Sequence, residues 1–212
     1  MAIEAVIWDF GGVFTTSPFE AFDRYEKANG LPQGLIRKVN STNPDGNAWA
    51  LFERNDIDAA GFDTLFHEES SALGHPVPGR EVLPLLAGDL RPRVVEALKA
   101  CKALYKVGCI TNNMATMHSP GPDAGGMAGA MASLFPLFDA VIESSKAGVR
   151  KPDPRIYLMM CELLNVEPAA CIYLDDLGIN CKPAAALGMH AIKVTDEASA
   201  LAALSAATGL AL

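Results

Sequence analysis

The chain has 212 residues, of which half are hydrophobic and a fifth are charged, and its net charge is −8 at pH 7. This composition supports a buried core of ordinary size and argues against a chain that is disordered throughout. The acidic balance disfavours binding to nucleic acid or to an anionic membrane surface, because both require an excess of Lys and Arg.

Several features of the chain favour a soluble, cytoplasmic protein. No uninterrupted apolar stretch approaches the roughly 20 residues that are needed to cross a bilayer. The N-terminus enters a strand-like run without the basic stretch and cleavage site of a secretory signal. The five cysteines form no CxxC pair and are odd in number, so we expect buried free thiols, which suit the reducing cytosol.

Short β-like runs alternate with helical patterns along the chain, which is typical of an α/β fold with a mostly parallel sheet covered on both faces. Strands are predicted at residues 5–8, 107–110, 140–142, 171–174 and 191–194. Helices are predicted at residues 91–105, from Pro154 onward, at 179–187 and at 197–207. A Gly- and Pro-rich passage at residues 119–129 indicates a loop after the second strand.

The first strand is not followed by a simple crossover. Roughly 75 residues separate it from the helix that leads into the second strand, whereas a βαβ connection needs only about 10–12. This stretch contains no convincing strand, and its helix-like segments are residues 18–29, 48–53 and 59–73. We therefore predict a helical cap at residues 16–90, placed over the end of the first strand, and a core at residues 1–15 and 91–212.

Aromatic residues of the predicted cap recur at helical spacing: Trp49, Phe52, Phe62 and Phe66. Such residues could line an apolar pocket for a substrate. The helical spacing favours the alternative, in which they form the core of the cap itself.

The first strand delivers the carboxylate of Asp9 into a glycine-rich turn that contains Gly11. Ligands of open α/β sheets bind at the carboxyl ends of the strands, which is where Asp9 lies. On its own the residue indicates no more than an aspartate in a turn. Polar clusters at comparable places farther along the chain favour a functional site: Thr111-Asn112, Lys151 and Asp175-Asp176.

The first two of these clusters suit the binding of a phosphoryl group. A hydroxyl and backbone amides at Thr111 and Asn112 can hold phosphoryl oxygens, although such residues also begin helices. Lys151 can place a point charge on phosphate, and the prolines around it favour a fixed side chain over an ordinary surface lysine. Lys146 is the rival candidate and ranks second.

The third cluster suits a divalent cation. The adjacent carboxylates of Asp175 and Asp176 repel each other, and a hard cation such as Mg²⁺ stabilises both in their ionised form. The alternative is a pair of acids favoured by the dipole of the helix that follows. Asn180, on that helix, faces either the site or the helix surface.

In this order the clusters resemble those of the haloacid dehalogenase-like hydrolase superfamily. More narrowly, residues 110–113, 138–144, 148–157 and 173–183 resemble the phosphatase-type N-terminal domain of soluble epoxide hydrolases. The Lys-Pro-Asp-Pro block at residues 151–154 and the Leu-Asp-Asp block at residues 174–176 are the specific part of this likeness.

The resemblance implies a Rossmann-like three-layer core with a small helical cap inserted after the first strand. It implies that Asp9 is the nucleophile and that Mg²⁺ is held by Asp9, the backbone carbonyl of Gly11, and Asp176 with Asp175 beside it. Thr111, Asn112 and Lys151 would then bind the phosphoryl group of a small phosphate monoester, and the reaction would pass through an aspartyl-phosphate. The resemblance also allows a homodimer.

One residue departs from the family pattern. Phosphatases of this superfamily carry a second aspartate, two residues after the nucleophile, which serves as general acid and base; here that residue is Gly11. General acid–base catalysis typically contributes about 10²–10⁴-fold. Residues shortly after the turn are candidates to replace it: Thr15, Thr16, Glu20 and Asp23.

Gly11 therefore leaves alternatives to a phosphatase open. One is a metal-independent 2-haloacid dehalogenase, although the Asp175-Asp176 pair argues against a site without metal. The other is a catalytically weak protein that binds phosphate. Nothing in residues 16–90 identifies a substrate.

Overall fold

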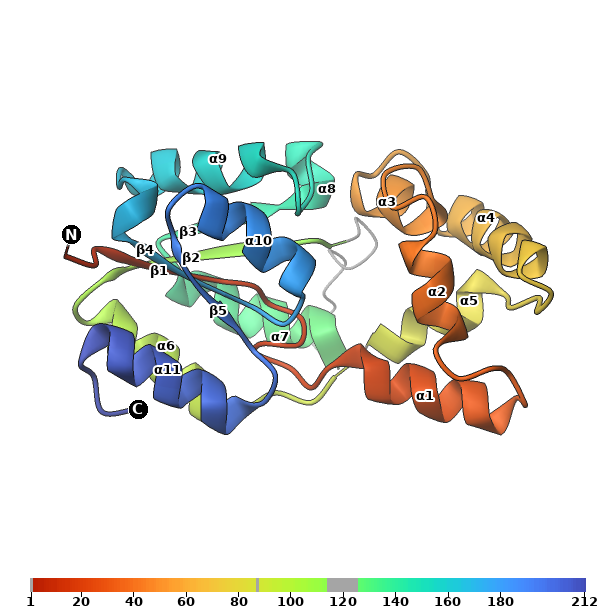
Figure 1. Cartoon of the computed structure of the whole chain (residues 1–212), viewed down its shortest axis with the longest axis horizontal. Coiled ribbons are helices and arrows are strands. Elements are labelled where there is room, and N and C mark those ends of the chain that lie inside the picture. Colours follow the sequence, from red (N-terminus) through yellow and green to blue (C-terminus); the bar gives the residue numbers. More distant parts are fainter. Residues whose placement is uncertain (1, 87, 114–125) are drawn as a thin grey trace.

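The computed structural model describes residues 2–86, 88–113 and 126–212. At its centre lies a parallel sheet of five strands in the order β3-β2-β1-β4-β5 (Figure 1). The strands are β1 (Ala5–Trp8), β2 (Lys106–Thr111), β3 (Ala140–Glu143), β4 (Cys171–Asp175) and β5 (His190–Lys193). Each predicted strand is present, and its ends differ from the prediction by at most one residue. The α/β, Rossmann-like fold class is thus confirmed.

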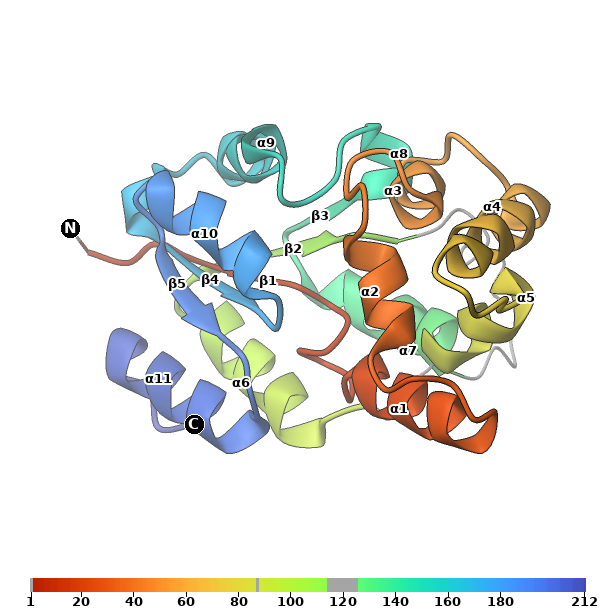
Figure 2. The ribbon, with the colours of Figure 1, turned by 45° about the vertical axis from the view of Figure 1, so that its right-hand side comes forward.

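Helices cover both faces of the sheet, which is why β1 is apolar along its whole length. Val6 and Trp8 point to one face, where they pack in a cluster with α6 (Pro92–Lys102), α7 (Gly126–Leu134) and α11 (Glu197–Thr208). Ala5 and Ile7 point to the other face and pack with α9 (Pro154–Leu164) and α10 (Gly178–Ala186) (Figures 1 and 2). The alternation of side chains along a strand produces these two apolar layers.

The prediction of a loop at residues 119–129 is wrong for the part of this range that the structure describes. Residues 114–125 lie outside the described part of the chain, but residues 126–129 belong to α7. Glycines in this passage favour a loop, whereas the later Ala130, Met131 and Leu134 bury their side chains against the sheet. Packing of these residues against the core outweighs the weak helix propensity of the glycines.

Between β1 and α6 the chain forms a helical insert, which lies on the right in Figure 1. Its elements are α1 (Pro18–Ala28), α2 (Leu35–Ser41), α3 (Ala48–Glu53), α4 (Ala59–Ala72), α5 (Gly79–Val82) and the 3₁₀ turn η1 (Leu83–Leu86). Asn47 and Asp58 accept backbone N–H groups at the starts of α3 and α4. Neither α2 nor α5 was predicted, because both are too short to show a helical period and glycine stands at the start of each.

The insert has its own apolar core. The rings of Trp49 and Phe52 lie 4.9 and 5.0 Å from that of Phe62, and Phe66 packs beside them. These aromatic residues are therefore the interior of the insert, as their spacing predicted. The chain leaves the sheet domain for the insert and returns to it at one place, where Thr15 forms an antiparallel bridge with Leu90.

The five cysteines are free thiols, four of them buried, as expected from the sequence. Burial raises the pKa of Cys109 well above its ordinary value, so this thiol is held in its neutral form. Among the described residues, no helix combines the length and the apolar character needed to cross a membrane.

Close packing between α4 and α5 makes Gly79 sensitive to substitution. An added β-carbon would lie 2.8 Å from the Cα of Asp63 and 2.9 Å from the carbonyl oxygen of Phe62, and backbone atoms cannot move aside as a side chain can. We expect Gly79→Ala to lower the free energy of unfolding by about 1–3 kcal/mol, measured by urea unfolding. Gly178→Ala, whose β-carbon would meet only the Lys193 side chain at 3.8 Å, is the control. Equal stability of both variants would contradict this packing.

Candidate active site

The carboxyl ends of β1 and β4 bring two predicted site residues together. These strands pair in parallel with Trp8 opposite Leu174, so the residues that follow, Asp9 and Asp175, lie side by side at one edge of the sheet. Lys151, from the segment that leads into α9, reaches between them. Its ammonium nitrogen lies 2.6 Å from Asp9 Oδ1 and 2.9 Å from Asp175 Oδ2, and its side chain is only 1% exposed.

Asp175 is the most completely hydrogen-bonded acid of the site. Oδ1 accepts the backbone N–H of Leu177 (2.8 Å) and the side-chain amide of Asn180 (3.1 Å). Oδ2 accepts Lys151, the hydroxyl of Tyr173 (2.5 Å) and the same Asn180 amide. Both oxygens are thus occupied by donors of the chain, and the side chain is fully buried. This geometry suits a residue that holds Lys151 in place.

Asp176 lies against the glycine turn that follows Asp9. Gly12 has a φ of +73°, which favours glycine, and a β-carbon there would lie 2.2 Å from Asp176 Oδ2 and would displace that carboxylate. Asp176 is partly exposed, unlike its neighbour Asp175. One carboxylate oxygen from each of Asp9, Asp175 and Asp176 lies within 4.8 Å of the others.

The charges of these four side chains do not balance one another. Three carboxylates face one ammonium, which leaves an excess of two negative charges when all are ionised. Burial raises the pKa of Asp9, Lys151 opposes the rise, and Asp175 and Asp176 add to it. Burial, followed by repulsion from Asp175, raises the pKa of Asp176 to about 6. Oxygen donors with excess negative charge fit a hard divalent cation such as Mg²⁺.

Burial alone would lower the pKa of Lys151, but the carboxylates of Asp175 and Asp9 outweigh it and raise the pKa above its ordinary value. The ammonium is therefore charged at neutral pH. Lys146, the rival candidate, instead pairs with Glu143 and is largely exposed. The structure thus places Lys151, and not Lys146, between Asp9 and Asp175.

The remaining predicted residues also lie at this edge of the sheet. Thr111 is the last residue of β2 and is buried, and Gly11 is half-buried in the turn after Asp9. The side chain of Asn112 is paired with the backbone of Lys151: its Oδ1 accepts the Lys151 N–H (2.9 Å), and its Nδ2 donates to the Lys151 carbonyl (3.0 Å). Asn112 thereby fixes the segment that carries the lysine.

Two of the candidates for a replacement acid, Thr15 and Thr16, are engaged in local structure. The hydroxyl of Thr15 accepts the N–H of Gly12 at 3.2 Å, and that of Thr16 accepts the N–H of Asp89 at 3.1 Å. Asp23 is half-buried on α1. The side chain of Glu20 lies outside the described part of the structure.

Sequence analysis missed several residues that support the site. Tyr173 lies two positions before Asp175 on the same face of β4, so the strand period could have identified it. Asn180, whose orientation the sequence left open, faces Asp175. Glu53 reaches the site from the insert and pairs with Arg150, a long-range contact for which the sequence offered no signal.

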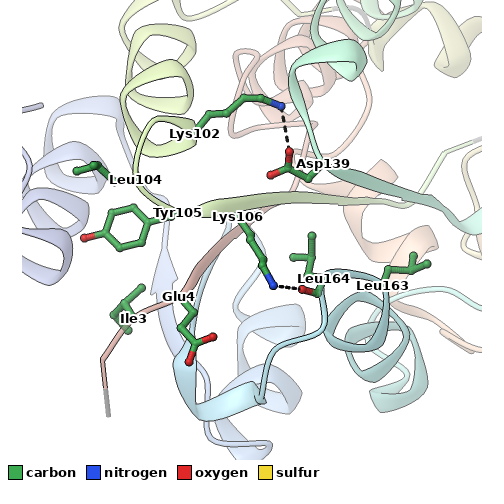
Figure 3. A pocket seen from close by; sticks show the side chains of 9 residues that line it. All are labelled: Ile3, Glu4, Lys102, Leu104, Tyr105, Lys106, Asp139, Leu163 and Leu164. Carbon is green, nitrogen blue, oxygen red and sulfur yellow. Dashed lines mark hydrogen bonds and ion pairs between the residues drawn. The ribbon is translucent and has the colours of Figure 1, made fainter.

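A large surface hollow lies at the opposite edge of the sheet (Figure 3). Its volume is about 710 Å³, and its lining includes Glu4, Lys102 and Lys106 at the amino ends of the strands. Lys102 donates to Asp139, and Lys106 donates to the carbonyl of Leu164. Because both ammonium groups are already used by the protein, this hollow does not compete with the acidic cluster as the candidate site.

Comparison with known proteins agrees with this arrangement. A family model of haloacid dehalogenase-like hydrolases matches residues 3–188. The chain is a haloacid dehalogenase-like hydrolase. The match covers most of the chain and confirms the family resemblance seen in the strand-end clusters.

Curated relatives of this hydrolase include multidomain proteins. Mouse acyl-CoA dehydrogenase family member 10 is 33% identical over 98% of this chain and 19% of its own length. Mouse bifunctional epoxide hydrolase 2 is 31% identical over 99% of this chain and 39% of its own length. The hydrolase thus spans less than half of either relative. Sesquiterpene phosphatase astK of Aspergillus oryzae is 28% identical over 92% of this chain and 91% of its own length.

A solved structure shares the fold. An enzyme of the same family from Bacteroides thetaiotaomicron, in complex with magnesium and inorganic phosphate, superposes with a TM-score of 0.62 at 19% identity. The match covers 94% of this hydrolase and 99% of that chain. At this identity the likeness concerns the fold alone.

The two adjacent acids should respond differently to substitution. Asp175→Asn removes one of the two carboxylates that neutralise buried Lys151, so we expect the free energy of unfolding to fall by about 3 kcal/mol or more. Asp176→Asn removes a repulsive charge and should leave stability in metal-free buffer unchanged or slightly raised. Urea unfolding at pH 7 with EDTA measures both. A larger loss in Asp176→Asn than in Asp175→Asn would contradict the assignment of Asp175 as the support of Lys151.

Proposed function

We propose that this protein is a Mg²⁺-dependent phosphatase that cleaves small phosphate monoesters through an aspartyl-phosphate. The convergence of Asp9, Lys151, Asp175 and Asp176 at one sheet edge carries the proposal. A phosphate dianion would be repelled by the excess negative charge of this cluster unless a cation accompanied it. A phosphatase among the curated relatives, astK, supports the same reaction class.

In the proposed reaction Asp9 is the nucleophile. A carboxylate oxygen of Asp9 forms a bond to phosphorus while the bond from phosphorus to the ester oxygen breaks, and water then cleaves the acyl phosphate. The backbone N–H of Phe10 and the ammonium of Lys151 both donate to Asp9 Oδ1, at 2.7 and 2.6 Å, so the carboxylate is held in one orientation. Thr111 and Lys151 would bind the phosphoryl oxygens.

Asp9, Asp176 and the backbone carbonyl of Gly11 are the residues that we propose to hold Mg²⁺. Asp175 completes the acidic cluster, but its two oxygens already accept donors from the chain, so we assign it to Lys151 first. When bound, the cation would neutralise the negative charge of the phosphate and of the departing oxygen.

The helical insert would serve as a cap. We place its boundaries at residues 16–90, and the bridge between Thr15 and Leu90 at the crossing to the sheet domain supports them. α3 of the insert lies against the sheet domain, where the Glu53 carbonyl accepts the Ser144 hydroxyl at 2.6 Å. A cap in this position would exclude water and contact the leaving group. The buried free thiols are consistent with a cytoplasmic location.

Gly11 limits which esters the enzyme would cleave well. No carboxyl at this position can protonate the leaving oxygen. Esters are therefore favoured when their leaving group is stable as an anion and departs without a proton. Aryl phosphates and sugar-anomeric phosphates are of this kind. Gly11 also supports the second candidate function, a phosphate-binding protein with little turnover.

The first test is turnover of p-nitrophenyl phosphate with Mg²⁺. We expect activity that is lost on adding EDTA and that falls at least about 10³-fold in Asp9→Asn, because the nucleophile is removed. Far-ultraviolet circular dichroism should show that Asp9→Asn remains folded.

Other results would redirect the assignment. Release of chloride from 2-chloropropionate without metal would support the dehalogenase. Absence of both activities, together with a higher melting temperature in Mg²⁺ and phosphate, would support the binding protein. Asp9→Asn with undiminished turnover would rule out the proposed nucleophile.

Installing the missing acid should widen the range of substrates. We expect Gly11→Asp to raise kcat/KM for alkyl phosphates by about 10-fold or more, because a carboxyl there can protonate the leaving alcohol. The gain for p-nitrophenyl phosphate should be smaller, since its leaving group needs little protonation. A folded, Mg²⁺-binding Gly11→Asp variant without a gain on alkyl phosphates would show that another step limits hydrolysis.

A further inference from the structure

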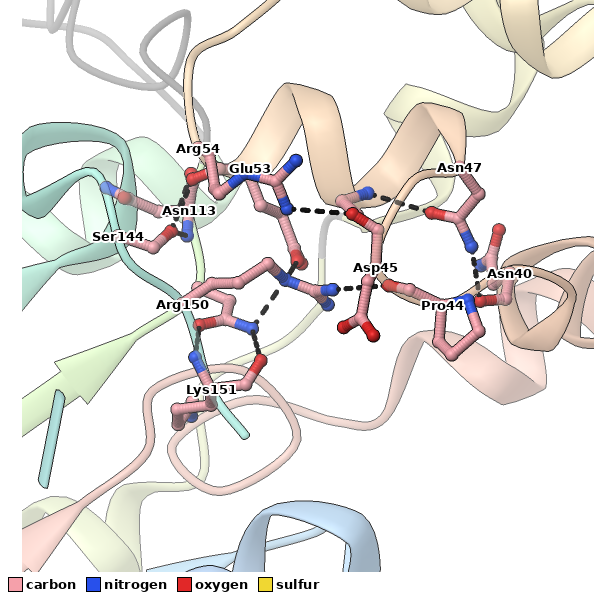
Figure 4. Close-up of polar contacts among 12 residues, drawn as sticks. Asn40, Pro44, Asp45, Asn47, Glu53, Arg54, Asn113, Ser144, Arg150 and Lys151 are labelled. Atoms are coloured by element: carbon pink, nitrogen blue, oxygen red, sulfur yellow. Dashed lines mark hydrogen bonds and ion pairs between the residues drawn. The ribbon is translucent and has the colours of Figure 1, made fainter. Parts of the chain in front are cut away.

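The insert and the sheet domain are joined near the site by polar contacts. The buried apolar residues of the insert form one cluster, separate from the two clusters that pack on the sheet. At the end of α3, Glu53 makes an ion pair with Arg150 of the sheet domain, with Oε2 and Nε 2.6 Å apart (Figure 4). The side chains of Glu53 and Arg150 are 14% and 20% exposed, so the pair is shielded from most solvent.

Further contacts surround this ion pair. Arg150 also donates to the carbonyl of Pro44, in the loop before α3, at 3.0 Å. The Ser144 hydroxyl that donates to the Glu53 carbonyl accepts the N–H of Asn113 at 3.0 Å. Two points of the insert, Pro44 and Glu53, are therefore tied to residues at the sheet edge (Figure 4).

The same carboxylate also reaches the residue that holds Lys151. Asn112 Nδ2 lies 3.4 Å from Glu53 Oε2, and the Asn112 side chain is paired with both backbone groups of Lys151. Arg150 is the residue immediately before Lys151. Glu53 thus contacts the lysine segment on two sides, through the Asn112 amide and through the preceding arginine.

We propose that Glu53 is a positioning residue: docking of the insert through Glu53 fixes the backbone of Lys151 and so places its ammonium between Asp9 and Asp175. Glu53 acts through Asn112 and Arg150 and does not touch the reacting atoms. This inference rests on the proposed function for its kinetic part only. Its structural part, that the insert controls the order of the lysine segment, stands independently.

The test uses Glu53→Gln, which keeps the shape of the side chain and removes its charge. Hydrogen exchange of a peptide that contains Arg150 and Lys151 reports the Lys151 N–H bond to Asn112, and Pro152 and Pro154 contribute no amide hydrogen to it. We expect faster exchange in this peptide and unchanged exchange in β4. We also expect kcat for p-nitrophenyl phosphate to fall by about tenfold or more, with a smaller change in KM, because catalytic groups are displaced.

Arg54→Gln is the matched control. Arg54 is adjacent to Glu53, but its partners, Asp56 at 2.9 Å and the Asp45 carbonyl at 3.1 Å, both belong to the insert. This variant should exchange and turn over like the wild type. The double variant Glu53→Gln/Arg150→Gln removes the charge that Glu53→Gln leaves unpaired, and it should remain as impaired as the single variant.

Two results would overturn the proposal. One is wild-type exchange of the Lys151 peptide in both Glu53 variants. The other is recovery of wild-type kcat in the double variant, which would attribute the defect to the unpaired charge of Arg150. If the wild type itself shows no turnover, the phosphatase proposal fails, while the exchange measurement still decides whether Glu53 orders the lysine segment.

Discussion

The buried ammonium of Lys151, held between Asp9 and Asp175, is the interaction on which the site depends. It joins the end of β1, the end of β4 and the segment before α9, which are far apart in the chain. An isolated charge in such an interior would cost several kcal/mol, and each carboxylate offsets part of that cost. The donors around Asp175, from Tyr173, Leu177 and Asn180, hold its carboxylate in one orientation, so the lysine has a defined place.

The same cluster gathers like charges at some expense of stability. Burial, followed by repulsion between the acids, raises the pKa of Asp9 and Asp176, and Lys151 offsets part of the rise in both. A core designed for stability alone would not gather these acids. Gly12 permits this crowding, because it adopts the left-handed backbone without strain and leaves room for the Asp176 carboxylate beside it.

Much of this fold could be predicted because its signals are local. The strands of a doubly covered sheet are short apolar runs, and acids such as Asp9 and Asp175 mark their ends. The helix α7 could not be predicted, because its glycines favour a loop. Its helical form depends on the burial of Ala130, Met131 and Leu134 against the sheet, which is a tertiary contact. The contacts of Glu53 with Arg150 and Asn112 could not be predicted either: Asn112 is 59 positions away, and only the docking of the insert brings these residues together.

Both crossings between the sheet domain and the insert lie side by side. Thr16 N–H donates to the Asp89 carbonyl at 2.9 Å, and Arg91 N–H donates to the Phe14 carbonyl at 2.8 Å, so the chain departs and returns through one narrow neck. A segment that is attached at one place and has its own apolar core packs largely independently of the sheet domain. The insert is therefore a separately packed unit that meets the sheet domain at this neck and at the contacts of Pro44 and Glu53.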